Sequence, residues 1–569
     1  MSLTSTLNLG RNALSINQAA IQTTGSNISN VGNPEYTRQR ADITTARDQQ
    51  LRPGVYVGNG PQLDGISRQI DDALEGRLRN SMSEGESAAA QQSWLGRLEA
   101  TFNELGDADL STQMSKFFNS WSDLANKPQD AGLRQVVLQT GKSVAGWFRQ
   151  MDGQIGALRT NLSETIEGKA AQADELATKI ANLNTEIVKA EGAGVGAMAN
   201  GLRDQRDGAL KALSGLIDTR TVEQPNGVVN VYVGSEPLVS NGNSRGVKTL
   251  LDTDAAGDSV VKVVFKSNNG ELDLKSGELG GLLASRRQLD GTATNLSDLA
   301  GGLTFELNKI HAGGQGQHGF ASVIGTTTVT DTTKALSDPD SGLKQMPANG
   351  SFVVHVKDKT TGLTSSTLIK VDLPEGGGGT STDDLIARID GVDGVTAVNN
   401  GGRLQLTADN APATEITFSQ DTSGALAALG VNNFFTGSDA RTIAVNEVLT
   451  KDPSLLAAAR NGNSGDNQVA RAIAGLETAA ITALGGGTLK SSYEGMVTEV
   501  ATASSTASAN AEASTAITET LQAQRESLSG VSLDEEAINL MKYQRAFQGA
   551  ARLVSVVDEL MDTMLGMVR

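Results

Sequence analysis

Apolar residues near the start of the chain recur in steps of seven. Leu7, Leu14, Ile21 and Ile28 form this stripe, and the positions between them are mainly small or polar. Such a period predicts a helix whose narrow apolar face packs against a partner helix. Its many Asn and Gln residues have low helix propensity, so the helix needs that partner to be stable. The breakers in Asn30-Val31-Gly32-Asn33-Pro34 predict that the helix ends there.

A second and wider apolar stripe runs along the last residues of the chain. Its main line is Leu540, Phe547, Val554, Met561 and Leu565, and further apolar residues lie on its flank. One partner helix cannot cover a helix that is apolar over more than half its circumference. At a chain terminus we expect other copies of the same subunit to supply the additional neighbours. An ordinary core helix in a monomer is the alternative that periodicity alone leaves open.

The body of the chain alternates between helical and β-rich patterns. A helical region runs from Trp94 to about Ile217, and its clearest part, residues 162–187, repeats apolar residues as a coiled coil does. Residues 275–318 return to a helical pattern. The Ala-, Ser- and Thr-rich stretch 466–528 is also in helical register, although a partly disordered tract of low complexity is the alternative there.

Two intervals between the helices are rich in β-branched residues. Residues 228–233 and 260–265 predict strands of a small module, and residues 352–356, 367–371 and 403–407 predict strands of a larger one. Residues 383–389 predict a short helix after a Ser or Thr cap, which makes the larger module α+β.

These patterns predict a multidomain α+β chain with terminal helices that pair as a coiled coil, a discontinuous helical-bundle domain and two inserted β-rich domains. The predicted divisions are a terminal helical assembly domain of residues 1–60 plus 525–569, a discontinuous helical domain of 61–217 plus 275–321 plus 438–524, a small β-rich module of 218–274, and a β-rich (α+β) outer domain of 322–437. A chain of 569 residues is long enough for several domains.

Composition and charge exclude several classes of protein. The formal net charge of -18 would repel a phosphate backbone, so nucleic acid is not expected as a partner. No run approaches the ~18 apolar residues of a membrane span, and the first residues lack the features of a cleaved signal peptide. The absence of cysteine removes disulfides, thiolate metal sites and thiol nucleophiles.

Candidate catalytic and binding motifs all fail on inspection. The histidines, at 311, 318 and 355, have no metal-ligand spacing around them, and we expect His311 and His318 in a solvated loop. Thr140-Gly141-Lys142-Ser143 lacks the upstream glycine of a phosphate-binding loop. Gly194-Val195-Gly196 follows a helix where a dinucleotide fingerprint requires a strand. We therefore predict no catalytic, cofactor-binding or metal-ligating residues, no cofactor, and a protein that is not an enzyme.

Both ends of the chain contain stretches that resemble one family. The stretch from Ser26 to Arg40, which includes Asn-Val-Gly-Asn-Pro-Glu-Tyr-Thr-Arg-Gln, is similar to the start of bacterial flagellar rod, hook and hook-associated proteins. The stretches Ser529–Ala537 and Asn539–Phe547 are similar to the C-terminal motif of the same axial proteins. Together with the length and the helical region after Trp94, they most resemble the hook-associated protein 1 family, which forms the hook-filament junction.

The resemblance implies a structural adaptor that joins hook to filament in the bacterial flagellum. It also implies export through the flagellar secretion channel without a cleaved signal peptide, and polymerisation through paired N- and C-terminal helices. The implied partners are further copies of the chain in a ring or helix, the hook protein, the second junction protein and filament side, and a cytoplasmic export chaperone at the C-terminal helix. Another axial subunit (hook, rod or filament protein) is the close alternative, and a surface adhesin is the more distant one.

Two groups of residues are predicted to act in assembly. We expect the N-terminal stripe to pack against the C-terminal one, so the assembly contacts are Leu7, Leu14, Ile21, Ile28, Leu540, Phe547, Val554, Met561 and Leu565. We expect the loop that leaves the paired helices to be shaped by Asn30, Gly32, Pro34 and Tyr36. Simple termination of the helix is the alternative role for these loop residues.

Overall fold

The computed structural model describes residues 3–103, 109–192, 198–253, 259–374 and 378–567. Contacts between residues divide the chain into two units, each described here by itself. Unit 1 comprises residues 1–94, 162–285 and 505–569, and unit 2 comprises residues 95–161 and 286–504. Four helices contribute residues to both units: α2 (Asp72–Asn103), α4 (Ala131–Glu191), α6 (Gly277–Ala312) and α11 (Leu489–Ser529).

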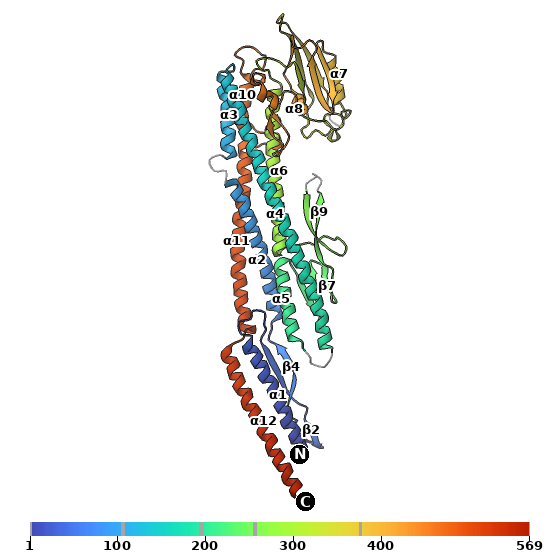
Figure 1. Cartoon of the computed structure of the whole chain (residues 1–569), viewed down its shortest axis with the longest axis vertical. Helices are drawn as coiled ribbons and strands as arrows, with labels where there is room; N and C mark the ends of the chain where they lie inside the picture. The colour runs from blue at the N-terminus through green and yellow to red at the C-terminus, as the bar shows by residue number, and fades with distance from the viewer. Residues whose placement is uncertain (1–2, 104–108, 193–197, 254–258, 375–377, 568–569) are drawn as a thin grey trace. The chain divides into compact units, whose positions relative to one another are not determined.

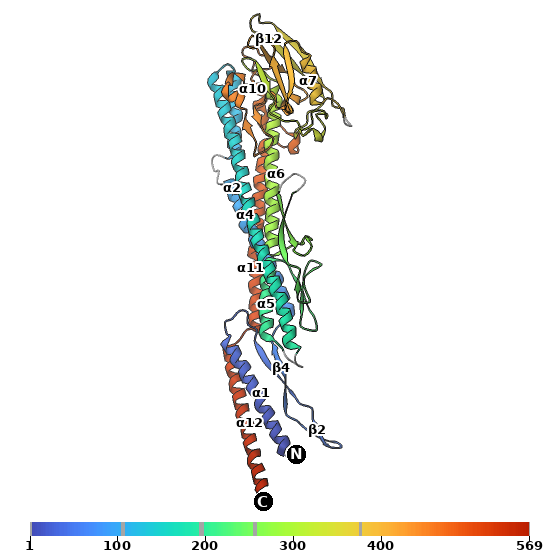
Figure 2. The ribbon, with the colours of Figure 1, turned by 45° about the vertical axis from the view of Figure 1, so that its right-hand side comes forward.

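The two ends of the chain meet in unit 1. Helix α1 (Leu3–Ser29) lies beside helix α12 (Leu533–Met567), and both views show the pair (Figures 1 and 2). A long hairpin, hairpin 39–68, follows α1. Its tip turns at Pro53-Gly54, where Gly54 has φ +80°, a value that favours glycine in a type II turn. The hairpin pairs β1 (Gln39–Thr45) with β4 (Pro61–Arg68) and β2 (Gln49–Arg52) with β3 (Val55–Val57).

The remainder of unit 1 consists of helices with two small sheets. Leu74 and Leu78 of α2 pack with Leu521 of α11 in a buried apolar cluster. Helix α5 (Asn200–Leu216) precedes an antiparallel sheet in the order β5-β6-β7-β8 and the separate pair β9–β10. The strands are β5 (Arg220–Glu223), β6 (Val229–Val233), β7 (Glu236–Ser240), β8 (Asn243–Ser244), β9 (Val247–Thr253) and β10 (Ser259–Phe265).

Unit 2 has an aromatic core among its helices. Phe117 and Trp121 of α3 (Leu110–Asn126) pack with Phe434, and the ring centroids of Trp121 and Phe434 lie 5.5 Å apart. The other helices of unit 2 are α7 (Thr382–Asp390), α8 (Ala425–Leu429), α9 (Glu447–Lys451) and α10 (Gln468–Gly475). Helix α7 begins with a capping box, in which Ser381 and Asp384 each accept a hydrogen bond from the other's backbone N–H.

Two three-stranded antiparallel sheets form the β-rich part of unit 2. Their strand orders are β13-β12-β16 and β11-β15-β14, and a short pair, β17–β18, follows. The strands are β11 (Ser322–Ile324), β12 (Gly350–Asp358), β13 (Thr364–Val371), β14 (Val395–Asn400), β15 (Arg403–Ala408), β16 (Thr414–Ser419), β17 (Phe435–Thr436) and β18 (Ala444–Val445).

Most predicted elements are confirmed, with two differences. The predicted strands and the capped helix at 383–389 are present, but the strands of hairpin 39–68 were not foreseen. The helix expected over 466–528 is interrupted between α10 and α11, where Gly485 and Gly486 adopt positive φ angles. The segments that were predicted to form one discontinuous helical domain are divided between unit 1 and unit 2. The predicted division of the chain into four domains stays a prediction. The rejected Gly194-Val195-Gly196 motif lies outside the described residues.

The expectation of a solvated loop is wrong for His311, although His318 is exposed. His311 lies in the last turn of α6 and is completely buried. Its Nδ1 donates a hydrogen bond of 2.7 Å to the carbonyl of Asn432, and its Nε2 accepts one of 3.0 Å from the N–H of Ala457. Burial lowers its pKa to about 4, and the nearby Arg134 adds to the effect. His311 is therefore a neutral core residue.

Candidate assembly interface

Helices α1 and α12 run antiparallel along each other in unit 1. Asn27 of α1 contacts Glu536 at the start of α12, whereas Gly10 lies against Val554 further along it. A Cβ on Gly10 would come within 2.6 Å of the Val554 Cγ2. The absence of a side chain at position 10 therefore lets the two backbones approach closely.

The predicted N-terminal stripe lies on the flank of this contact. Leu7, Leu14, Ile21 and Ile28 are all only partly buried. The fully buried face of α1 is smaller and more polar, and it consists of Gly10, Ile16, Ala20, Thr23, Thr24 and Asn27. The four apolar side chains of the predicted stripe thus keep exposed surface in the single chain.

The predicted C-terminal stripe faces α1 over most of its length. Leu540, Phe547, Val554 and Met561 are partly buried, on the same face as the buried Ala550 and Val557. Leu565 differs, because its side chain is 68% exposed. The end of α12 extends past α1 in both views (Figures 1 and 2). Packing of these residues against other copies stays a prediction.

The loop after α1 wraps back onto the helix that it leaves. Asn30 donates its backbone N–H to the carbonyl of Ser26, and Gly32 has φ +81°. The Tyr36 hydroxyl donates a hydrogen bond of 2.8 Å to Oδ1 of Asn27. Burial raises the pKa of Tyr36, and the nearby carboxylates of Asp204 and Glu536 add to the rise. Asn30, Gly32, Pro34 and Tyr36 line one hollow of about 620 Å³.

Asn27 connects α1 to both the hairpin and α12. Its side chain is buried, and its Nδ2 donates to the carbonyl of Gln39 at 2.9 Å and to Oε2 of Glu536 at 3.0 Å. Its Oδ1 accepts hydrogen bonds from the N–H of Gln39 and from the hydroxyl of Tyr36. A buried amide with this many partners fixes the geometry of the segments around it.

Arg38 at the start of the hairpin neutralises the first turn of α12. Its Nε donates to Oε1 of Glu536 at 2.9 Å, and one terminal nitrogen donates to Oε2 of Glu535 at 2.6 Å. Partial burial opposes the charge on Arg38, but the hydrogen bonds to Glu535 and Glu536 outweigh it and raise the pKa of Arg38. Glu536 is only 2% exposed, so Arg38 is its compensating charge.

A second ion pair, between Arg525 and Glu75, lies beside the loop after α1. Arg525 near the end of α11 contacts Glu75 of α2 at 2.6 Å and donates to the carbonyl of Pro34 at 3.1 Å. The backbone N–H of Arg38 donates to the carbonyl of Ser529. Asn27, Arg38, Arg525 and Glu536 were not among the predicted site residues. Asn27, Arg38 and Glu536 lie within the two terminal stretches that carry the family resemblance. That resemblance is the sequence signal that could have identified them.

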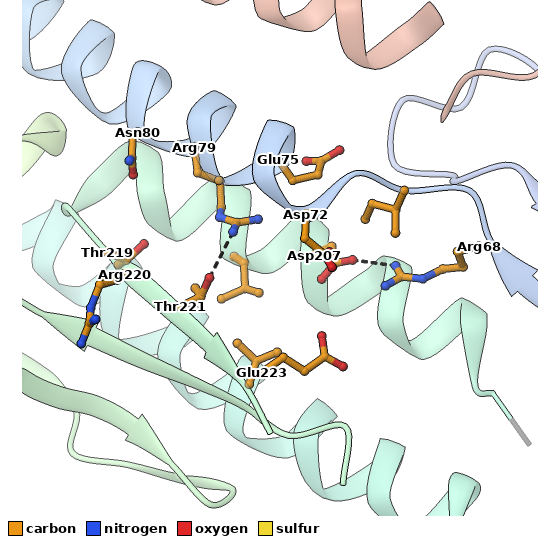
Figure 3. A pocket seen from close by; sticks show the side chains of 14 residues that line it. Arg68, Asp72, Glu75, Arg79, Asn80, Asp207, Thr219, Arg220, Thr221 and Glu223 are labelled. Atoms are coloured by element: carbon orange, nitrogen blue, oxygen red, sulfur yellow. Dashed lines mark hydrogen bonds and ion pairs between the residues drawn. The ribbon is translucent and has the colours of Figure 1, made fainter. Parts of the chain in front are cut away.

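In a separate hollow of about 530 Å³ in unit 1, half of the lining residues are charged (Figure 3). Arg68 of β4 contacts Asp204 at 2.9 Å and Asp207 at 2.6 Å, and Arg79 of α2 donates to the Thr221 hydroxyl at 3.0 Å. Burial raises the pKa of Asp204, although the guanidinium of Arg68 opposes the shift. Arg68 is thus already compensated by two carboxylates of the chain, as expected of a structural contact between β4 and α5.

Neither a metal site nor a single membrane span is found in the described part of the chain. Within these ranges no three or more His, Asp or Glu side chains gather in a way that could hold an ion. Of the helices described, none alone has the length and apolarity to cross a membrane, while one bent pair, Gln468–Leu484 with Leu489–Met567, meets those criteria together.

Comparisons with known proteins point to the bacterial flagellum. Residues 95–323 match the family described as "Flagellar hook-associated protein FlgK helical domain", and residues 522–567 match "Flagellar basal body rod FlgEFG protein C-terminal". Flagellar hook-associated protein 1 of Escherichia coli (strain K12) is 25% identical over 99% of this chain and 100% of its own length. The protein of the same name from Bacillus subtilis (strain 168) is 22% identical over 98% of this chain and 97% of its own length.

A solved structure shares the fold. The flagellar hook junction protein FlgK from Burkholderia pseudomallei is 17% identical, with a TM-score of 0.50, and the match covers 80% of this chain and 100% of that chain.

Proposed function

This chain resembles flagellar hook-associated protein 1 over its full length, and on that premise we propose that it is a structural subunit of the hook-filament junction. The observation that carries the proposal is the end-to-end similarity, which covers 99% of this chain and 100% of the Escherichia coli relative. In the hollow beside β4, Arg68 is paired with Asp204 and Asp207, as expected of a structural contact.

The subunit polymerises through its terminal helices, which pair as a coiled coil and extend that pairing to neighbouring copies. Two features of α1 and α12 support this. Leu7, Leu14, Ile21 and Ile28 keep exposed surface on the flank of the pair. Leu565 and Met567 at the end of α12 are 68% and 76% exposed. Apolar surface of this kind is expected to be covered in an assembly.

The proposed position of the subunit at the hook-filament junction determines its partners. Copies of the chain form a ring or helix that contacts the hook protein on one side, and the second junction protein and filament on the other. A cytoplasmic export chaperone covers the apolar residues of α12 before the subunit leaves the cell through the flagellar channel. The exposed apolar side chains of α12 support this, because a free surface of that kind promotes aggregation.

A rod or hook subunit is the rival function. The match of residues 522–567 to the C-terminal family of basal body rod proteins favours it. The two functions differ in which part of the flagellum is lost without the subunit, because rod and hook subunits precede the hook-filament junction in the structure. An experiment that scores hooks and filaments separately therefore distinguishes them.

The test is a deletion of residues 541–569 from this chain, made in the bacterium that encodes it. We expect cells that keep their hooks, have no attached filaments and release unpolymerised filament subunit into the medium. Phe547→Asp, which alters the partly buried face of α12, should reproduce this result, and Lys542→Ala on its exposed surface should leave filaments attached. Loss of hooks as well would establish the rod or hook function, and normal filaments would refute assembly through α12.

A further inference from the structure

The tip of hairpin 39–68 presents apolar side chains to solvent. Val55 and Tyr56 are 37% and 61% exposed, and Figure 2 shows the tip directed away from α1. Arg52 adjoins the turn at the tip, and Arg47 lies just before β2, next to Asp48. Neither arginine forms an ion pair within the residues that the structure covers. A two-stranded hairpin is only marginally stable by itself, so a binding partner would stabilise it. Exposed aromatic side chains near arginines are typical of protein-binding surfaces.

The outer face of α12 has the complementary character. Val556, Leu560 and Met564 follow four-residue steps, and their exposed fractions are 52%, 49% and 53%. Asp558, Glu559 and Asp562 lie beside them, with no Lys or Arg between Leu553 and Met567. The outer face of α12 is therefore an apolar stripe with acidic neighbours, whereas the hairpin tip is apolar with basic neighbours.

These two surfaces lie on different sides of α1. A Cβ on Gly60 of the hairpin would come within 2.9 Å of Leu9, whereas a Cβ on the next residue of the helix, Gly10, would meet Val554 of α12. Both views show α1 between α12 and the hairpin (Figures 1 and 2). Because α1 separates them, the tip and the outer face of α12 do not meet within one chain.

We propose that the hairpin tip of one copy docks on the outer face of α12 of the next copy. This inference rests on the proposed function, since it requires that copies of the chain assemble. Different patches on opposite sides of α1 make a head-to-tail contact, which continues from copy to copy and produces a ring or a helix. Tyr56 and Val55 cover Leu560 and its apolar neighbours, and Arg47 and Arg52 face Asp558 and Asp562.

Cysteine cross-linking tests the contact in the assembled flagellum. The chain has no cysteine, so introduced ones are its only thiols. In a strain that lacks its own copy, Tyr56→Cys/Leu560→Cys should give a ladder of disulfide-linked dimers, trimers and larger species when purified flagella are mildly oxidised. Each single variant, and the control Tyr56→Cys/Leu251→Cys with its 71% exposed position on β9, should stay monomeric.

Charge reversal provides an independent measurement. Arg47→Glu/Arg52→Glu should reduce the number of attached filaments by about tenfold, because like charges then face each other across the contact. Adding Asp558→Lys/Asp562→Lys to the same chain should restore filaments to about half of the original number or more. Normal filament numbers with the arginine variant alone, or no recovery in the combined variant, would overturn the inference.

The outcomes separate the two proposals. If the unaltered chain restores filaments but Tyr56→Cys forms no cross-link with a cysteine at 556, 560 or 564, the docking of the hairpin is wrong and the junction function stands. If the unaltered chain fails to restore filaments to a strain that lacks it, the proposed function is wrong and the docking falls with it.

Discussion

Asn27 of α1 donates a hydrogen bond of 3.0 Å to the buried carboxylate of Glu536 in α12, and the two residues are 509 positions apart in the chain. Arg38 binds the other oxygen of the same carboxylate. The two ends of the chain are therefore joined by a polar contact at the point where both leave the helix pair. Buried groups of this kind fix register as well as stability, because any shift leaves a charge without its partner.

Glu536→Gln should loosen the helix pair, because it removes the charge that compensates Arg38. We expect a loss of about 2 kcal/mol, the range for a hydrogen bond to a charged group. Amide hydrogen exchange in α1 and α12 of the monomer should then be about 30-fold faster. Glu535→Gln is the matched control, since Glu535 also binds Arg38 but its side chain is 61% exposed, and its effect should be small. Equal effects of the two variants would show that burial of Glu536 does not matter.

Gly10→Ala should also weaken the pair, although alanine favours helix. The new methyl group meets the stiff side chain of Val554, and overpacking costs ~1–3 kcal/mol against a gain in helix propensity of ~1 kcal/mol. Gly25→Ala is the control in the same helix, because a Cβ there has no neighbour within 4 Å. Amide exchange of α1 should be slower in Gly25→Ala and faster in Gly10→Ala.

A second substitution checks the cause of the Gly10 effect. In the background of Val554→Ala the clash is absent, so adding Gly10→Ala should stabilise the helix pair by up to ~1 kcal/mol. If Gly10→Ala slows exchange in the unaltered chain as much as Gly25→Ala does, the close approach of α1 and α12 is not the reason for the glycine.

Tyr36→Phe should release the loop after α1 while it leaves the helices in place. The variant removes the hydrogen bond to Asn27 Oδ1, which still accepts from Gln39, so we expect a cost of about 1 kcal/mol. The measurement is the rate of proteolysis within residues 30–36. Tyr56→Phe on the exposed hairpin tip is the control and should not change that rate. Unchanged proteolysis in Tyr36→Phe would mean that the hydroxyl does not hold the loop.

The periodicity of the sequence predicted the existence of the terminal helices, and runs of β-branched residues predicted five of the strands, because burial on one face imposes a pattern that remains visible in the residues. It did not predict which residues of α1 would be completely buried. Leu7 and Leu14 keep exposed surface, whereas Gly10, Ala20 and Asn27 are buried. Small residues permit the closest approach of two helices, and that advantage depends on the partner, which a local pattern does not contain.

The polar network at the junction of the helices was beyond prediction for a related reason. Arg38 and Glu536 each look like a solvated charge in the sequence, and only the fold brings them together. His311 was misjudged because the glycines after it suggested a loop. In the structure α6 continues to Ala312, and the carbonyl of Asn432 and the N–H of Ala457 provide the polar partners that a buried imidazole requires.

Acid should destabilise unit 2 through His311. Its pKa falls from 6.5 to about 4 on folding, because the buried imidazole is held neutral. The unfolded chain binds a proton at this residue below pH 6.5 and the folded chain does not until about pH 4. The stability that neutral His311 provides is therefore complete above pH 6.5 and is lost as the pH falls toward 4, by roughly 3 kcal/mol.

The comparison of two histidine variants isolates this effect from the carboxylates that titrate in the same range. Thermal unfolding can be followed by tryptophan fluorescence, to which Trp121 contributes, and the Trp121 ring centroid lies 6.2 Å from that of His311. His311→Gln should be less stable than the unaltered chain at pH 7, because glutamine cannot reproduce both hydrogen bonds, and should lose less stability on acidification. His318→Gln, at an exposed position, should keep the full dependence on pH. If His311→Gln and the unaltered chain lose equal stability between pH 7 and pH 4.5, the imidazole is not the group that makes the core of unit 2 sensitive to acid.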